Sequence, residues 1–231
     1  DAGRYVAAPF AHGRLIADAL MNPSQIALLR LGATFRPLVE QGELWRIVAA
    51  NYLHAGLPHF LVCAFSVVAM GPALEKIFST PKFIAIWTIA GAAGGAASAL
   101  VNRDTASVGA SGALFGLLGA MLALGVRYRG AIPGHQIRAI RHAALMILGF
   151  NLILGLTFPN VDNVAHLGGL AGGLAAAFVL GPHPLLIGRK PRFWEGRALW
   201  AFPIVAAMAL STGLAGTPSG HMPAVPLIGP T

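Results

Sequence analysis

The sequence predicts an all-α membrane protein, a polytopic bundle of membrane-spanning helices joined by short loops. Composition is the first observation behind this fold class. The 231 residues are 56% hydrophobic and 10% charged, whereas an ordinary soluble domain carries roughly 25% charged residues. The second observation is that the apolar residues form long runs, near the length of about 20 that a bilayer requires. No strand-like alternation competes with these runs.

Six of these runs are long enough to cross a bilayer, for which roughly 17 to 25 mostly apolar residues suffice. Short connections between them hold most of the proline and charge. We expect helices over residues 57–75, 82–101, 110–126, 142–158, 164–182 and 198–215. The single cysteine, Cys63, excludes a disulfide framework and a multi-cysteine metal site.

The regions that flank the predicted membrane core, residues 54–182, have a different composition. Residues 1–53 mix five arginines with four acids and contain no span-length run, so we expect an extramembrane lobe and an outer loop. Residues 183–215 should comprise a cytoplasmic loop and the last helix. Residues 216–231 are rich in proline and glycine and are expected to form a flexible tail. The chain starts with Asp1 rather than Met, and we expect further residues before it.

The basic loops predict the orientation, because short cationic loops stay on the cytoplasmic side of a membrane. The connection at 127–141 carries four arginines and no acid, and the connection at 183–197 carries four cations and one acid. We therefore place both in the cytoplasm, and the connections at 102–109 and 159–163 outside. The net charge of +8 then reflects topology, and no nucleic-acid partner is expected.

Polar side chains at the outer ends of the predicted spans are the candidates for chemistry. His54 and His59 stand at the start of the first run, Ser111 at the start of the third and His166 at the start of the fifth. An ionisable side chain inside an apolar run is costly unless it faces a partner or a cavity. This cluster therefore predicts a functional site in the outer leaflet.

Ser111 lies in Gly109-Ala110-Ser111-Gly112, between a loop and a predicted helix start. Backbone N–H groups are free at such a position and can bind an oxyanion, which the glycines let approach closely. The same motif is also typical of small-residue helix packing, in which Ser111 would only hydrogen-bond across helices.

His166 is followed by pairs of glycines with the spacing that allows close helix packing, namely Gly168, Gly169, Gly172 and Gly173. Gly112 and Gly116 offer a matching face on the helix of Ser111. Close packing would bring the imidazole within the roughly 2.6–3.2 Å over which a general base removes a hydroxyl proton.

His166 could instead be a buried neutral imidazole or a ligand of a metal or porphyrin. A zinc site usually has three or more ligands, and no acid at helical spacing accompanies the three histidines. We therefore expect no metal and no cofactor. Asp162 is interpreted as a helix-start residue, so a Ser-His dyad is favoured over a triad.

Taken together, these residues resemble the rhomboid family of intramembrane proteases over roughly residues 40–182. The motifs that carry the resemblance occur in the family's order: Trp45-Arg46, His54 and His59, Gly71 and Glu75, Gly109-Ala110-Ser111-Gly112, and Ala165-His166-Leu167-Gly168-Gly169. The resemblance implies a six-helix core, of which the first helix would precede Asp1, plus one extra C-terminal helix. It also implies a location in the bacterial inner membrane, with the site on the non-cytoplasmic side.

The resemblance further implies an intramembrane serine endopeptidase that cuts membrane proteins in or near their transmembrane helices. Ser111 would be the nucleophile and His166 its base, and His54 would help to hold the oxyanion. Trp45 and Arg46 would be interfacial anchors, and Glu75 would serve structure.

Two positions depart from the family's pattern. Cys63 stands where the family has an Asn that donates to the oxyanion, and a thiol is a weaker donor. Phe115 stands where the family usually has a Tyr that packs on the His, so the ring is kept and the hydroxyl is lost. A second hypothesis is therefore a rhomboid-like pseudoprotease that binds a partner helix in the bilayer without cutting it. A transporter ranks last, because no pair of matching halves is visible.

Overall fold

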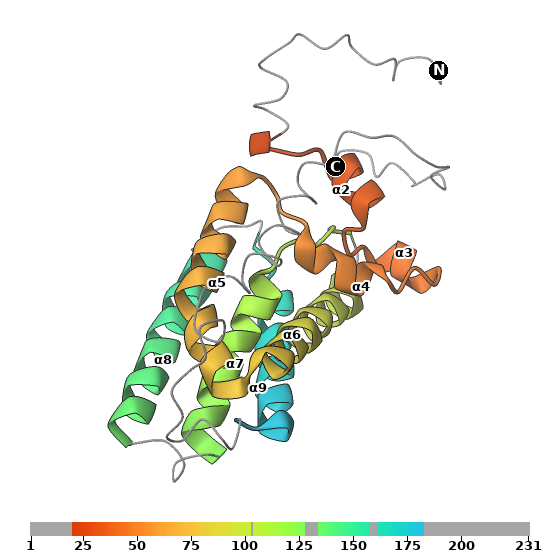
Figure 1. Ribbon diagram of the computed structural model, residues 1–231. Helices are drawn as coiled ribbons and strands as arrows, with labels where there is room; N and C mark the ends of the chain where they lie inside the picture. Colours follow the sequence, from red (N-terminus) through yellow and green to blue (C-terminus); the bar gives the residue numbers. More distant parts are fainter. Residues whose placement is uncertain (1–19, 103, 128–133, 158–160, 183–231) are drawn as a thin grey trace, which may run out of the picture.

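The computed structural model describes residues 20–102, 104–127, 134–157 and 161–182, and this part of the chain is helical. Its long helices are α5 (Leu57–Phe78), α6 (Thr80–Val101), α7 (Ser111–Arg127), α8 (Gly134–Thr157) and α9 (Asn163–Leu180), which form a bundle (Figure 1). Short helices lie at one end of that bundle: α2 (Gln25–Leu31), α3 (Arg36–Glu40), α4 (Arg46–Ala49) and the 3-10 turn η1 (Ala50–Tyr52).

The all-helical prediction is confirmed for the described residues. Helices α5, α6 and α9 are long and apolar enough to cross a bilayer, and α7 is a shorter apolar helix. One boundary was predicted wrongly: α8 begins at Gly134, two turns before the apolar run at 142. Exposed Arg138 and Arg141 continue the helix there, because helix propensity does not require an apolar side chain. The predicted helix at 198–215, the connection at 183–197 and the tail lie outside the described residues.

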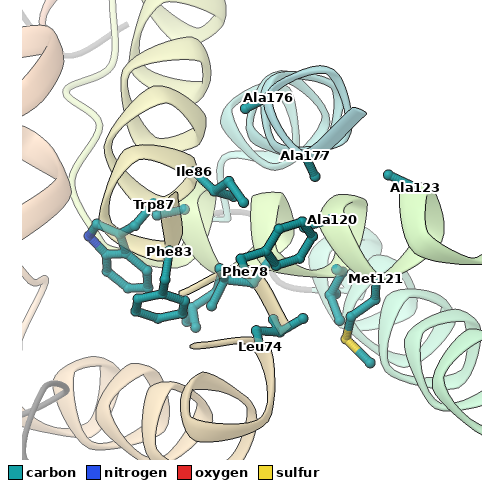
Figure 2. Packing of buried hydrophobic residues seen from close by; sticks show 14 of the residues in the cluster. Leu74, Phe78, Phe83, Ile86, Trp87, Ala120, Met121, Ala123, Ala176 and Ala177 are labelled. Atoms are coloured by element: carbon teal, nitrogen blue, oxygen red, sulfur yellow. The ribbon is translucent and has the colours of Figure 1, made fainter. Parts of the chain in front are cut away.

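Large side chains fill the half of the bundle that lies away from the short helices. Figure 2 shows side chains from four helices meeting there: Leu74 and Phe78 of α5, Phe83, Ile86 and Trp87 of α6, Ala120 and Met121 of α7, and Ala176 and Ala177 of α9. Phe78 and Trp87 are each at most 1% exposed. Nearby, Glu75 is buried and accepts a hydrogen bond of 2.6 Å from Thr80 Oγ1, which joins the end of α5 to the start of α6.

Glycine replaces large side chains where α7 crosses α9. A Cβ at Gly169 would overlap the backbone carbonyl of Gly112, and a Cβ at Gly173 would overlap that of Gly116. The predicted match between these glycine faces is therefore confirmed. Backbones at this separation gain dispersion contacts that bulkier residues would prevent.

The second glycine pair of α9 faces a different helix. A Cβ at Gly168 or at Gly172 would lie 2.5 Å from the Cβ atom of Ala97 or of Ala93, respectively, both on α6. The two interleaved spacings thus hold α9 against two neighbours at once. This arrangement fixes the N-terminal half of α9 between α6 and α7.

We predict that Gly173→Ala lowers the free energy of unfolding by about 1–3 kcal/mol, the usual cost of overpacking a close contact. The added methyl group would meet the backbone of Gly116, which cannot move aside as a side chain can. Gly149→Ala on α8 is the matched control, since nothing lies within 4 Å of the position of its Cβ. That variant should be neutral or more stable by about 0.5–1 kcal/mol. Unfolding in detergent micelles measures both, and equal stability of the two variants would contradict the prediction.

Candidate active site

Ser111 is the first residue of α7, and the loop before it is held on both sides. The N–H of Gly109 donates to the carbonyl of Ala50 at 2.9 Å. Gly109 has a φ of 126°, and a Cβ at this position would lie 2.5 Å from Cε1 of His59. Only glycine satisfies both constraints without strain. The loop backbone therefore rests against the imidazole of His59 immediately before Ser111.

His166 stands in the first turn of α9 and is 7% exposed. Its ring stacks on Phe115, with centroids 4.1 Å apart and an angle of 7° between the planes. Phe115 lies one turn after Ser111 on α7, and a Cβ at Gly112 would lie 3.5 Å from the carbonyl oxygen of Ala165. The structure thus brings the starts of the helices that carry Ser111 and His166 together.

The two upstream histidines form an edge-to-face pair. The rings of His54 and His59 have centroids 5.2 Å apart at 69°, and Phe60 contacts His54 in the same manner at 5.6 Å. His54 is fully buried, and neither of its ring nitrogens has a hydrogen-bond partner within the described part of the chain. Buried polar atoms in proteins are nearly always paired, so unpaired nitrogens mark a place where a polar ligand would be favourable.

Cys63 lies on α5, one turn beyond His59, and is 2% exposed. It belongs to a buried cluster that also contains Ala110 and Leu114, the neighbours of the Ser111 turn. The thiol is not a hydrogen-bond partner of His54, whose nitrogens have none in the described residues. As for metals, no group of three or more His, Cys, Asp or Glu residues is near enough to bind an ion among the residues that the structure describes.

Arg46 differs from its predicted role. The sequence suggested an interfacial anchor, and this is wrong for its guanidinium, because Arg46 is only 6% exposed. It donates to the carbonyls of Leu29 and Ala33 and pairs with Glu43, with Nη2 at 2.7 Å from Oε2. Trp45, at 51% exposed, remains suited to an interface. Arg46 instead holds the short helices together.

The short helices are in turn joined to the loop before Ser111. Thr34 and Ser107 exchange two backbone hydrogen bonds, of 3.0 and 2.8 Å, as an isolated antiparallel bridge. The hydroxyl of Thr34 donates to the carbonyl of Arg46 at 3.1 Å. Residues 24–53 therefore brace the loop that leads into α7. Sequence reasoning missed this link, since its partners are far apart in the chain and have no distinctive spacing.

Asp162 caps α9 and does more than the sequence indicated. Its carboxylate accepts from the N–H of Ala165 at 2.9 Å, from Asn102 Nδ2 at 3.1 Å and from Ser98 Oγ at 2.5 Å. Burial by itself would raise the pKa of Asp162, but hydrogen bonds from Ser107, Ser98, Ala165 and Asn102 together outweigh it and lower that pKa. Asp162 is therefore ionised at neutral pH.

Comparison with known proteins gives a family match and several relatives. A family described as Rhomboid domain matches residues 41–183. RHOMBOID-like protein 5 of Arabidopsis thaliana is 40% identical over 168 residues, which are 71% of this chain and 52% of that protein. RHOMBOID-like protein 1 of the same plant is 38% identical over 74% of this chain and 43% of that protein. Rhomboid protease GluP of Bacillus subtilis is 36% identical over 67% of this chain and 29% of that protein. The chain thus spans about half the length, or less, of these relatives.

We predict that Arg46→Ala loosens the loop before Ser111 as well as the short helices. Loss of the guanidinium removes its hydrogen bonds to the carbonyls of Leu29 and Ala33 and its ion pair with Glu43, and a buried polar group left without a partner costs about 1–3 kcal/mol. Hydrogen exchange should accelerate at residues 25–53 and at 105–110, as followed by mass spectrometry. Arg30→Ala, at an exposed position on α2, is the control and should change neither segment. Unchanged exchange at 105–110 in Arg46→Ala would show that the bracing is absent.

Proposed function

The chain belongs to the rhomboid family, and from that premise we propose that it is an intramembrane serine endopeptidase with Ser111 and His166 as its catalytic dyad. Its apolar helices make it an integral, multi-pass membrane protein. The observation that supports the dyad best is the stack of Phe115 on His166, one turn from Ser111, where α7 and α9 touch through glycines.

In the proposed reaction, Ser111 Oγ attacks the carbonyl carbon of a peptide bond while His166 takes the hydroxyl proton. The protonated imidazole then gives this proton to the leaving amine, and an acyl-enzyme remains. Water, activated by the same imidazole, adds to the ester carbonyl and releases Ser111 with a new carboxyl terminus. These two steps use His166 as the base twice and need no reactant besides the substrate and water.

The orientation of the base is proposed to come from packing. Nδ1 of His166 has no hydrogen-bond partner in the described part of the chain, so no carboxylate orients the ring through that atom. The stack on Phe115 fixes the plane of the ring instead. A phenylalanine suffices for this task, since stacking requires the ring and not a hydroxyl group.

The negative charge that develops on the substrate oxygen is proposed to be held by three kinds of donor. The first backbone N–H groups of α7 have no partner within the helix. His54 can donate from a ring nitrogen that has no partner in the described residues. Cys63 could add a weak S–H donor from α5. Gly109, Gly112, His59 and Phe115 are proposed to support the site without reacting.

For the whole protein, we propose the topology that the loop charges predict. The site would face the non-cytoplasmic side of a bacterial inner membrane, and its substrate would be another membrane protein's transmembrane helix. The short helices within residues 20–53 would lie outside the bilayer core, and residues 54–182 would form the rhomboid core.

A pseudoprotease that binds a partner helix without cutting it is the second candidate, and Cys63 is the observation that favours it. A thiol in place of a stronger donor weakens oxyanion binding, and loss of one such donor can lower kcat by roughly 10²–10³-fold. Both members of the proposed dyad are nevertheless present.

We predict that the protein, reconstituted in proteoliposomes, cleaves a reporter with a single transmembrane helix and that Ser111→Ala abolishes cleavage. Loss of the nucleophile removes the acyl-enzyme route entirely. Ser66→Ala is the matched control, because Ser66 Oγ only donates to the carbonyl of Val62 within α5. Fragments are measured on gels and by mass spectrometry. Cleavage that persists in Ser111→Ala would exclude the assignment, and intact reporter that stays bound to the wild type would favour the pseudoprotease.

We also predict that Cys63→Asn raises kcat by about tenfold or more, because an amide N–H is a stronger oxyanion donor than a thiol. Cys63→Ala, which removes the donor and keeps a small apolar side chain, should lower kcat or leave it unchanged. The turnover of the same reporter measures both variants. A Cys63→Asn protein that stays folded and cuts no faster than Cys63→Ala would remove position 63 from the oxyanion hole.

A further inference from the structure

We propose that Asp162 is a positioning residue for the dyad, because its carboxylate ties the turn that carries His166 to α6 and to the loop that leads into Ser111. This role rests on the proposed proteolytic function and goes beyond helix capping. Asp162 is not proposed to touch the substrate.

The first step is the set of segments that meet at the carboxylate. Oδ1 accepts from Ala165 N at the start of α9 and from Asn102 Nδ2 at the end of α6. Oδ2 accepts from Ser98 Oγ, one turn earlier on α6. The hydroxyl of Ser107, in the loop before α7, also lies close enough to the carboxylate to lower its pKa. The start of α9, the end of α6 and the loop that follows α6 thus meet at one acidic group.

The second step is the position of His166 within this network. The backbone N–H of His166 donates to the backbone carbonyl of Asp162 at 3.1 Å. Because the carboxylate of Asp162 also accepts from Ala165 N, Asp162 holds both His166 and its neighbour. On the other side, a Cβ at Gly94 of α6 would lie 2.7 Å from the carbonyl oxygen of Ala165. The first turn of α9 is therefore fixed by hydrogen bonds at its start and by a close contact along its side.

The third step is the link to the nucleophile. The side chain of Ser107 lies near the carboxylate of Asp162, and its backbone is held by Thr34. Gly109, two residues later, donates to Ala50 and packs on His59 immediately before Ser111. A displacement of about 1 Å between a base and its nucleophile can cost about 10²-fold in rate. A single carboxylate that lies against both the turn that carries His166 and the loop that leads into Ser111 limits that displacement.

The fourth step concerns charge. The carboxylate forms no ion pair with any residue in the described part of the chain, and neutral donors surround it instead. An asparagine at this position could still accept from Ala165 N through its one oxygen, because Asn is as good an N-cap as Asp. The hydroxyl of Ser98 can rotate to accept from the new amide group. Asp162→Asn should therefore keep most of the geometry that Asp162→Ala loses.

Kinetics of reporter cleavage in proteoliposomes test the role. We expect Asp162→Ala to lower kcat by about 10- to 100-fold with KM changed by less than about twofold, since substrate binding does not involve Asp162. Asp162→Asn should recover most of kcat. Ser107→Ala, which removes only the connection to the loop, should fall between them. A kcat like that of the wild type in Asp162→Ala, or no recovery in Asp162→Asn, would overturn the proposal.

Ser66→Ala again provides a matched control, because Ser66 Oγ donates to the carbonyl of Val62 at 2.8 Å on its own helix, α5, and takes no part in the Asp162 network. This variant also loses a hydrogen bond between a side chain and the backbone. It should leave kcat unchanged. A drop in kcat as large as that of Asp162→Ala would mean that general loss of stability explains both, and would overturn the positioning role.

Hydrogen exchange separates failure of this role from failure of the proposed function. If the wild type does not cut the reporter, the proteolytic function fails, but exchange can still be measured. Asp162→Ala should accelerate exchange at 163–166 and also at 105–110, where the amides of Ser107 and Gly109 are hydrogen-bonded. Acceleration confined to 163–166 would reduce Asp162 to a helix cap and contradict the proposal.

Discussion

The separation between the backbones of α7 and α9 is the constraint on which the rest of the structure depends. A serine and a histidine on different helices can react only if their reacting atoms come within a hydrogen-bond distance, and ordinary side chains hold helix axes about 8–10 Å apart. Gly112 and Gly116 of α7 meet Gly169 and Gly173 of α9, and neither of the two glycines of α9 has room for a Cβ. The bilayer gives no hydrophobic force to press these helices together, so close van der Waals contact has to stabilise them.

The two halves of the bundle are packed differently: one by large apolar side chains, the other by small residues that allow the close helix contact. Around Phe78 and Trp87, large buried side chains from four helices fill the space and hold the bundle together. At the other end, small residues and hydrogen bonds position polar groups: Arg46 organises the short helices, Thr34 pairs with Ser107, and Asp162 links the end of α6 to the start of α9. The polar end can therefore carry ring nitrogens that have no partner among the described residues, such as those of His54, because the apolar end maintains the fold.

Much of this arrangement could be predicted from the sequence. Runs of apolar residues predicted the long helices, since span length leaves a strong local signal, and the spacing of Gly169 and Gly173 predicted the contact with α7. The start of α8 at Gly134 was missed because the hydropathy of a run does not report polar helical turns beyond it. The burial of Arg46 and the network of Asp162 were missed for another reason. Apart from Glu43 and Ala165, which are three residues away, their partners lie 12 to 64 residues away, and only the tertiary fold brings these groups together.

The account requires that Ser111 be activated by His166 through this helix contact. The most direct measurement is the covalent labelling of the reconstituted protein by a fluorophosphonate, with the modified residue mapped by mass spectrometry. One adduct on Ser111 Oγ in the wild type, and its loss in His166→Ala while that protein stays folded, is the predicted result. Labelling that is undiminished in His166→Ala, or absent from a folded wild type, would contradict the account.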